Sequence, residues 1–166
     1  SLEKKAVRGV ILRTLVLPVD TQRAPAKLLK AIDQQKPDVI VLLGESRTRA
    51  SITIERVAIN LLDFTLPDNA GARITDEPIV NGGPAAYFST LPIRDMLGAA
   101  RGVGVPTDLS MSAGTYLCNQ VMYAALHHIT ENELDARAGF VHLPALPESI
   151  AETGSAYPSM SVDTLA

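Results

Sequence analysis

The sequence contains no tryptophan and a single cysteine, and aromatic residues make up only 4% of its 166 residues. One cysteine excludes a framework of disulfides, so the fold depends on an ordinary apolar core. An excess of positive charge is missing too, because 15 Lys and Arg stand against 18 Asp and Glu, for a formal net charge of −3. That balance provides no basic face for a phosphate backbone, and we expect no nucleic-acid partner.

Long apolar runs are absent as well. A membrane-spanning helix needs roughly 18 consecutive apolar residues, whereas the longest such run, at residues 39–43, has the length of a strand. The N-terminus has no apolar segment of signal-peptide length followed by a small-residue cleavage site. We therefore expect no membrane association. A lone thiol without an export signal fits the reducing environment of the cytoplasm.

The residues that are present suffice for one packed domain. Hydrophobic residues make up 46% of the chain and charged residues 20%, which is too apolar for disorder. Short apolar runs alternate with longer stretches of helical spacing, and this order predicts an α/β fold with a twisted, mostly parallel sheet. We expect strands at residues 10–16, 38–44, 52–61, 107–111 and 139–143. We expect helices at residues 26–34, 92–100 and 116–129, and the opening of another near 158–161.

Two segments have a special character. Residues 38–44 are apolar on both faces, which predicts a fully buried central strand. Residues 64–89 are rich in Pro, Gly, Asp and Asn, and irregular segments of that length are usually functional or mobile. Acidic side chains in or beside this segment could meet a cation, although such acids more often belong to turns and the surface; they are Asp63, Asp68, Asp76 and Glu77. No Cys/His cluster has the spacing of metal ligands, and we expect neither a metal nor a cofactor.

Cys118 is a candidate nucleophile. Thr115 can cap a helix that begins at Tyr116, which would place Cys118 in the first turn. The free backbone N–H groups and the helix dipole favour a thiolate there, and a thiolate is the form that attacks a carbonyl carbon. The alternative is that Cys118 is a small, inert core residue.

His142 and Glu55 are the candidates for acid–base work. His142 stands at the carboxyl end of a predicted strand, where the sites of open α/β sheets gather. Glu55 lies inside an apolar strand and needs a partner, because an unpaired buried charge is very costly. That partner is either a nearby Arg, such as Arg56, or an imidazolium that Glu55 orients. A structural, hydrogen-bonded role for His142 remains open as well.

Two other features carry less information. The loop at residues 44–49 follows a buried strand and contains two Arg, but it lacks the glycine spacing of a phosphate-binding loop. His127 and His128 are adjacent near the C-terminal end of a predicted helix. There they either interact favourably with the helix dipole or face solvent.

Several of these stretches together resemble the pyroglutamyl peptidase family of cysteine peptidases. The matching strings are ERVAIN at residues 55–60, PDN at 67–69, GPAAYFSTLPI at 83–93, AGTYLCN at 113–119, GFVHLP at 139–144 and LPE at 146–148. The resemblance implies a single α/β/α sandwich over residues 1–166. It also implies removal of an N-terminal pyroglutamyl residue from peptides by way of a thioester.

The resemblance implies a role for each candidate residue. Cys118 would be the nucleophile, His142 the general base and acid, and Glu55 the residue that orients the imidazole. Pyroglutamate is a neutral lactam, so its pocket should be mostly apolar with a few fixed polar groups. The residues implied at the substrate are Glu45, Leu66, Tyr116 and Leu117.

The sequence departs from the family pattern in four places. The N-terminal strand with its Phe-containing loop, and most of the C-terminal helix, are missing from the 166 residues. Glu45 replaces a family Gln, and Thr65 replaces a family Arg two residues before the PDN string. The last two changes leave the catalytic trio intact and alter its surroundings. They motivate an alternative in which the protein binds peptides without catalysis. The family also implies a homo-oligomer, a dimer or tetramer.

Overall fold

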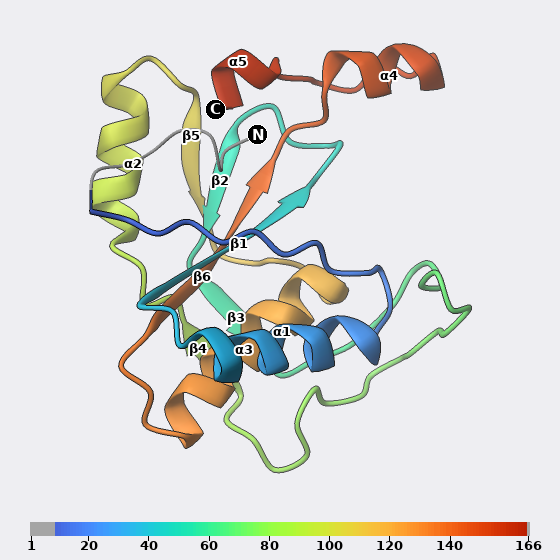
Figure 1. Cartoon of the computed structure of the whole chain (residues 1–166). Coiled ribbons are helices and arrows are strands. Elements are labelled where there is room, and N and C mark those ends of the chain that lie inside the picture. Colours follow the sequence, from blue (N-terminus) through green and yellow to red (C-terminus); the bar gives the residue numbers. More distant parts are fainter. Residues whose placement is uncertain (1–8, 166) are drawn as a thin grey trace.

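Four strands form the main sheet, in the order β1-β6-β2-β5 (Figure 1). β1 (Val39–Glu45) runs parallel to β6 (Arg137–Leu143), and β2 (Ile52–Glu55) runs parallel to β5 (Thr107–Ser110). The two parallel pairs meet where β2 and β6 pair antiparallel. The computed structural model describes residues 9–165.

Helices surround this sheet and complete the predicted α/β fold. In Figure 1, α1 and α3 lie together below the sheet, α2 packs beside β5, and α4 and α5 lie at the opposite end. Their bounds are Arg23–Gln35 for α1, Ile93–Gly102 for α2, Leu117–Glu131 for α3, Pro147–Thr153 for α4 and Val162–Leu165 for α5. The predicted helices at 26–34, 92–100 and 116–129 are confirmed with small shifts at their ends. The sequence pattern did not predict α4.

The predicted single strand at residues 52–61 is wrong, because the chain changes sheets in its middle. β2 ends at Glu55, and β3 (Val57–Ile59) pairs antiparallel with β4 (Ala86–Phe88) in a separate two-stranded sheet. Arg56 is the joint. Its N–H donates to Ser110 O on β5 at 2.8 Å, and its carbonyl accepts from Ser89 N after β4 at 3.0 Å. One residue therefore serves both sheets.

α3 is the centre of the hydrophobic core. It contacts α1 on one side and β6, β3 and β4 on the other. Met122, Tyr123 and Ala125 are fully buried, and Leu28 and Ile32 of α1 pack into the same cluster. A helix that is apolar around most of its circumference must be covered on most sides, which explains its central position.

The long irregular region between β3 and β4 is tied to α3 by buried polar groups. Asn119 accepts from Ile59 N at 2.9 Å and donates to the carbonyl oxygens of Ile59 and Leu61 at 2.9 and 3.0 Å. Tyr123 donates its hydroxyl proton to Pro84 O at 2.7 Å. These bonds satisfy backbone groups that no strand or helix pairs, so the region is anchored at both ends.

Asp68 belongs to a turn, in which the Gly71 N–H donates to Asp68 O at 2.9 Å. The Asp68 carboxylate accepts hydrogen bonds from the backbone N–H groups of Thr21, Ala70 and Ala72, each at 2.8 to 2.9 Å. The Thr21 amide and the other turn amides lower the pKa of Asp68 below its usual value. Asp68 thus joins the turn to the segment before α1, and its oxygens are occupied by amides.

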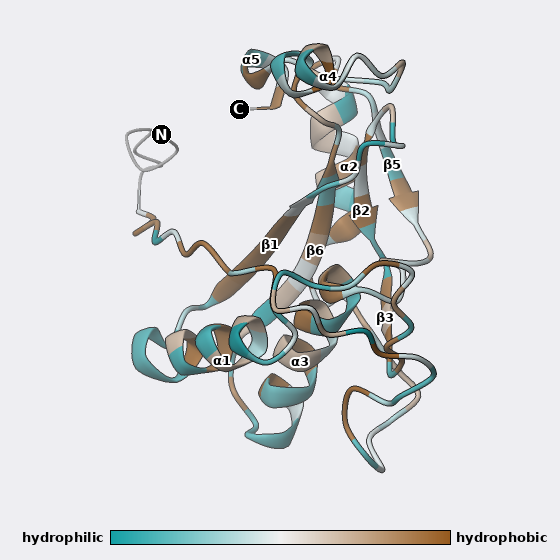
Figure 2. Ribbon diagram, turned by 90° about the vertical axis from the view of Figure 1, so that its right-hand side faces the viewer, coloured by the Kyte–Doolittle hydropathy of each residue, from teal (hydrophilic) through white to brown (hydrophobic). Residues whose placement is uncertain are grey.

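Two strand predictions are wrong at one edge of the main sheet. Residues 10–16 form no strand, and β1 is an edge strand rather than a buried central one. Val39, Val41 and Leu43, which share one face of β1, are 54%, 48% and 52% exposed. Figure 2 shows the apolar colour of β1 and of the segment before α1 on the outside of the molecule. An apolar run forms a strand only where a partner offers a ladder of hydrogen bonds, and within residues 9–165 β6 is the one strand that pairs with β1.

No helix within residues 9–165 combines the length and the apolar character that a membrane span requires.

Candidate active site

Glu55 and His142 form a buried pair at the carboxyl ends of their strands. His142 Nδ1 lies 2.8 Å from Glu55 Oε1. The side chain of Glu55 is fully buried, and His142 is 6% exposed. With Nδ1 donating to the carboxylate, the neutral imidazole has its lone pair on Nε2. The pair is therefore oriented to take up a proton on the side away from Glu55.

The sequence left two partners open for Glu55, an arginine or an imidazole, and the structure supplies both. Arg49 Nη2 lies 3.1 Å from Glu55 Oε1, the same oxygen that faces His142. Arg56, the arginine adjacent in sequence, serves the backbone joint instead. Glu55 Oε2 is buried and has no hydrogen-bond partner among the described residues.

Cys118 lies against the same face of the sheet as His142. Gly44 on β1 is paired in register with His142 on β6, so both residues project toward the same face. A methyl group at Gly44 would lie 3.2 Å from Cys118 Sγ and 2.7 Å from the ring of Phe140. Phe140 is two residues before His142, and their rings are 4.7 Å apart. The thiol therefore sits over the end of β1, beside the strand that carries the histidine.

The first turn of α3 holds Cys118, as predicted, but the predicted cap is wrong. The helix begins at Leu117, and its N-cap is Tyr116, which makes no capping bond with its side chain. Thr115 instead donates its hydroxyl proton to Asp63 O at 2.7 Å. This bond ties the start of α3 to the irregular region.

The thiol of Cys118 is not a preformed thiolate, which corrects the expectation from the helix dipole. Burial and the negative charge of Glu55 raise the pKa of Cys118 to about 11. Its own backbone N–H and the charge of Arg49 act in the opposite direction and are outweighed. No hydrogen bond joins Cys118 Sγ to His142 among residues 9–165. The resting site therefore holds a neutral thiol near an oriented imidazole.

The residues expected at the substrate lie on several sides of this centre. Glu45 ends β1 and pairs with Arg47 at 3.1 Å, with both side chains well exposed. Leu66 is 69% exposed in the irregular region, whereas Leu117 is buried in the core. Tyr116 donates its hydroxyl proton to Pro67 O at 3.2 Å, next to Leu66. Their contact with a substrate stays a prediction.

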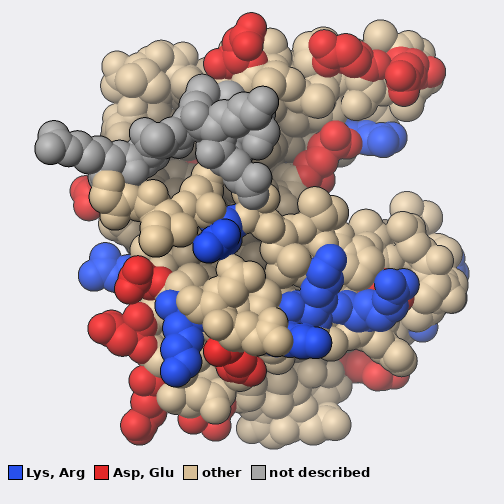
Figure 3. Space-filling model, viewed as in Figure 1, with Lys and Arg blue, Asp and Glu red and all other residues tan. Residues whose placement is uncertain are grey.

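A hollow is visible on the molecular surface near the end of β1. In the view of Figure 3 the surface is indented between the acidic residues around α4 and the basic residues over α1. In the same orientation the arrowhead of β1 points to that side of the molecule (Figure 1). The carboxyl end of β1 thus lies beside this indentation, and β6 runs in the same direction as β1, whereas β2 and β5 run in the opposite direction.

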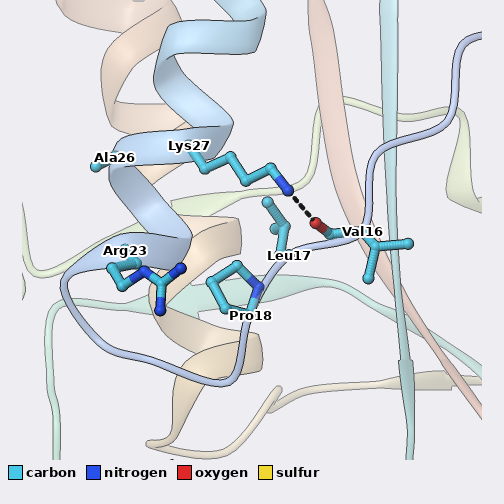
Figure 4. Close-up of a pocket in the computed structure, with 6 residues that line it drawn as sticks. All are labelled: Val16, Leu17, Pro18, Arg23, Ala26 and Lys27. Carbon is cyan, nitrogen blue, oxygen red and sulfur yellow. Dashed lines mark hydrogen bonds between the residues drawn. The ribbon is translucent and has the colours of Figure 1, made fainter. Parts of the chain in front are cut away.

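Another hollow lies away from the candidate residues. It has a volume of about 520 Å³ and lies between α1 and the segment before it (Figure 4). Lys27 donates to Val16 O across it at 2.8 Å. None of the three catalytic candidates lines this hollow, so it does not belong to their chemistry.

His127 and His128 are committed elsewhere. His127 Nδ1 lies 3.0 Å from the hydroxyl of Tyr87, and His128 Nε2 lies 2.6 Å from Asp33 Oδ1. They face opposite neighbours, as adjacent residues on a helix must. Within residues 9–165, neither ring forms a hydrogen bond or an ion pair with Glu55 or His142.

The sequence analysis missed three residues that shape the site: Gly44, Arg49 and Phe140. Gly44 leaves room for the thiol, and Phe140 packs against both Gly44 and His142. A glycine that closes an apolar strand is a signal for such a close approach. Arg49 gave no comparable signal, because its partner Glu55 is reached only through the fold.

Chemically, the site combines a thiol, an oriented imidazole and a buried carboxylate. Such a set supports nucleophilic attack on an acyl carbon, with the imidazole moving the proton.

Comparison with known proteins gives consistent results. A family profile described as pyroglutamyl peptidase matches residues 1–166. The pyrrolidone-carboxylate peptidase of Vibrio vulnificus strain CMCP6 is 44% identical over 149 residues, which cover 90% of this chain and 68% of the relative. That of Erwinia tasmaniensis is 42% identical over 164 residues, which cover 99% of this chain and 76% of the relative.

Solved structures agree in fold. A mutant pyrrolidone carboxyl peptidase from Pyrococcus furiosus superposes with a TM-score of 0.93 at 40% identity, over 96% of this chain and 78% of that one. Another mutant of the same enzyme gives a TM-score of 0.88 at 43% identity, over 90% of this chain and 74% of that one.

Proposed function

The chain belongs to the pyroglutamyl peptidase family, and from this premise we propose that Cys118, His142 and Glu55 are its catalytic residues. The single observation that carries the proposal is the buried pair of His142 Nδ1 and Glu55 Oε1, 2.8 Å apart. The thiol of Cys118 over Gly44, on the same face of the sheet, supplies the nucleophile.

The function is that of a cysteine peptidase that removes an N-terminal pyroglutamyl residue from peptides. Each named relative above is a pyrrolidone-carboxylate peptidase, which is the same activity. The alternative of a peptide-binding protein without catalysis has no support from these relatives.

The reaction begins with His142 as a general base. Because the thiol is neutral at rest, Nε2 removes the proton of Sγ as the sulfur bonds to the pyroglutamyl carbonyl carbon. Glu55 holds Nδ1 and stabilises the imidazolium that forms. The imidazolium then protonates the leaving amine as the C–N bond breaks. A thioester to Cys118 and a free peptide remain.

The second half of the reaction uses the same groups. His142 Nε2 takes a proton from water, whose oxygen attacks the thioester carbon. The C–S bond breaks, pyroglutamate leaves, and the sulfur regains its proton. The first N–H groups of α3 have no partner within the helix, and they are suited to bind the oxyanion of each tetrahedral intermediate.

Several finer properties follow the family. We propose that Glu45, Leu66, Tyr116 and Leu117 surround the lactam ring. We also propose a cytoplasmic location and a homo-oligomer, a dimer or tetramer.

A fluorogenic pyroglutamyl amide tests the proposal. The unmodified protein should release the fluorophore, and Cys118→Ser should lower kcat/KM by at least about 10⁴-fold, as expected when a nucleophile is lost. His142→Gln should have an effect of similar size. His128→Gln is the matched control, since that ring pairs with Asp33 at the surface and should leave the rate unchanged. Equal turnover by Cys118→Ser would remove Cys118 from the mechanism.

A further inference from the structure

Besides His142, Glu55 has a cationic neighbour that the reaction above does not use. Arg49 Nη2 approaches Oε1 to 3.1 Å, and His142 Nδ1 approaches the same oxygen to 2.8 Å. The carboxylate is fully buried, and the Arg49 side chain is 25% exposed. A charge at this depth interacts more strongly than one at the surface, because water screens it less.

The guanidinium of Arg49 is held in a fixed position. Nη1 donates to Thr53 Oγ1 at 2.6 Å, and Nη2 also donates to Ser112 O at 3.2 Å. Thr53 lies two residues before Glu55 on β2, so both side chains project from the same face of the strand. Ser112 lies in the segment that leads from β5 to Cys118. One side chain therefore joins the loop after β1, strand β2 and the approach to α3.

We propose that Arg49 is a positioning residue of the catalytic centre, which shares Glu55 Oε1 with His142 and fixes the charge that the imidazole and the thiol experience. The inference rests on the proposed function. Among the described residues, Arg49 forms hydrogen bonds and an ion pair with groups other than the sulfur and the imidazole, and it acts through Glu55 and through its charge. In keeping with this, the charge of Arg49 lowers the pKa of Cys118 against the effects of burial and of Glu55.

Among the described residues, Glu55 and Arg49 are the charged groups that act on Cys118, and the titratable groups of the neighbouring elements are as follows. From α3 and its start come Cys118 and Tyr116, and burial raises the pKa of Tyr116, which keeps the phenol neutral at neutral pH. From the end of β1 comes Glu45, whose charge is balanced by Arg47 at 3.1 Å. From β5 comes Asp108, whose carboxylate pairs with Arg101 at 2.7 Å. Arg49 is thus the cation that the described contacts place against Glu55.

The test is the pH profile of kcat/KM for Arg49→Met and Arg49→Lys. A plot of kcat/KM against pH should be bell-shaped, with a rising limb at low pH and a falling limb at high pH. Removal of a positive charge increases the proton affinity of every group near it, so both limbs should move to higher pH. We expect a shift of about half a unit to one unit. The maximum should fall at least about tenfold, as expected for the loss of one charge-assisted hydrogen bond. Arg49→Lys keeps the charge and should restore the limbs, with a partial recovery of the maximum.

A merely structural role predicts a different result. In that case Arg49→Met lowers the maximum and leaves both limbs in place, and this outcome would overturn the proposal. A lysine variant whose limbs match those of Arg49→Met would also overturn it. Arg47→Met is the matched control, because it removes a charge from the same loop where Glu45 already balances it, and its limbs should stay in place.

A second readout does not depend on peptidase activity. The alkylation of Cys118 by iodoacetamide, followed against pH in each variant, reports the ionisation of the thiol directly. Its midpoint should lie higher in Arg49→Met than in the unmodified protein and should return in Arg49→Lys. An unmodified protein that fails to cleave the pyroglutamyl amide refutes the proposed function, whereas equal midpoints in all variants refute the role of Arg49. Circular dichroism shows whether each variant is folded.

Discussion

The protonation state of Cys118 is the residue-scale property on which the mechanism depends. A thiol with a pKa of about 11 is only about 0.01% ionised at neutral pH. A standing thiolate is therefore scarce, and the proposed attack by Cys118 requires proton transfer to His142. The helix start favours the anion, but burial of the sulfur and the charge of Glu55 are the larger effects.

Alkylation of Cys118 should therefore be slow at neutral pH and steeply dependent on pH. The raised pKa means that thiolate accumulates only as the pH approaches 11, so the rate with iodoacetamide should rise about tenfold per pH unit between pH 7 and 10. Mass spectrometry of the modified peptide follows the rate. A fast reaction that is independent of pH above about 6 would show a preformed pair of Cys118 thiolate and His142 imidazolium. That result would contradict a thiol that is neutral before the substrate binds.

Gly44 is the second residue on which the geometry depends. A methyl group there would meet the Phe140 ring at 2.7 Å and Cys118 Sγ at 3.2 Å. Gly44→Ala should therefore displace the thiol, lower kcat/KM and destabilise the fold by about 1 to 3 kcal/mol, as overpacking does. Thermal and urea unfolding measure the loss.

Gly98→Ala provides the control for this substitution. Gly98 lies inside α2 with open space around its Cα, so the same added methyl group should stabilise the protein by about 0.5 to 1 kcal/mol. Opposite signs at the two glycines are expected. Equal stability of both variants would mean that the space at Gly44 is not limiting.

At the scale of elements, the sequence predicted most helices and strands and missed how the strands pair. The alternation of apolar runs located β1, β5 and β6, and helical spacing located α1, α2 and α3. Residues 10–16 are as apolar as a strand, yet they form no strand in the structure. The break at Arg56 was not predictable, because it depends on Ser110 and Ser89, which lie more than thirty residues away on the chain.

The catalytic candidates were predictable in kind, while their surroundings were not. A strand-end histidine, a buried acid and a thiol at a helix start are visible in the sequence. The neutral state of the thiol depends on burial, which only packing determines. Arg49 reaches Glu55 because β2 directs both Thr53 and Glu55 toward it, and that is again a property of the fold.

At the scale of the whole molecule, the outer side of β1 is an exposed apolar surface. Val39, Val41 and Leu43 share this face. The segment before α1 lies beside β1 and also exposes apolar side chains (Figure 2). The exposed apolar residues of that segment are Val10, Ile11, Leu12, Leu15, Val16 and Val19. Apolar surface of this kind favours association. The surface therefore agrees with the homo-oligomer proposed above.

Val41→Glu should weaken self-association, because it places a charge in the middle of this face. Size-exclusion chromatography with light scattering should show a smaller mean mass than for the unmodified protein. Val103→Glu is the control, since Val103 follows α2 and is 78% exposed away from β1. A single mass shared by all three proteins would show that this face takes no part in assembly.

The joint at Arg56 has a consequence for anyone who redesigns the enzyme. Glu55, the proposed orienting residue, lies one residue before it, and the irregular region that α3 holds through Asn119 begins four residues after it. One short backbone segment therefore supports both Glu55 and the start of the neighbouring irregular region. Grafting a new loop here to change substrate preference would also shift the backbone next to Glu55, so the loop and the proposed catalytic centre must be engineered together.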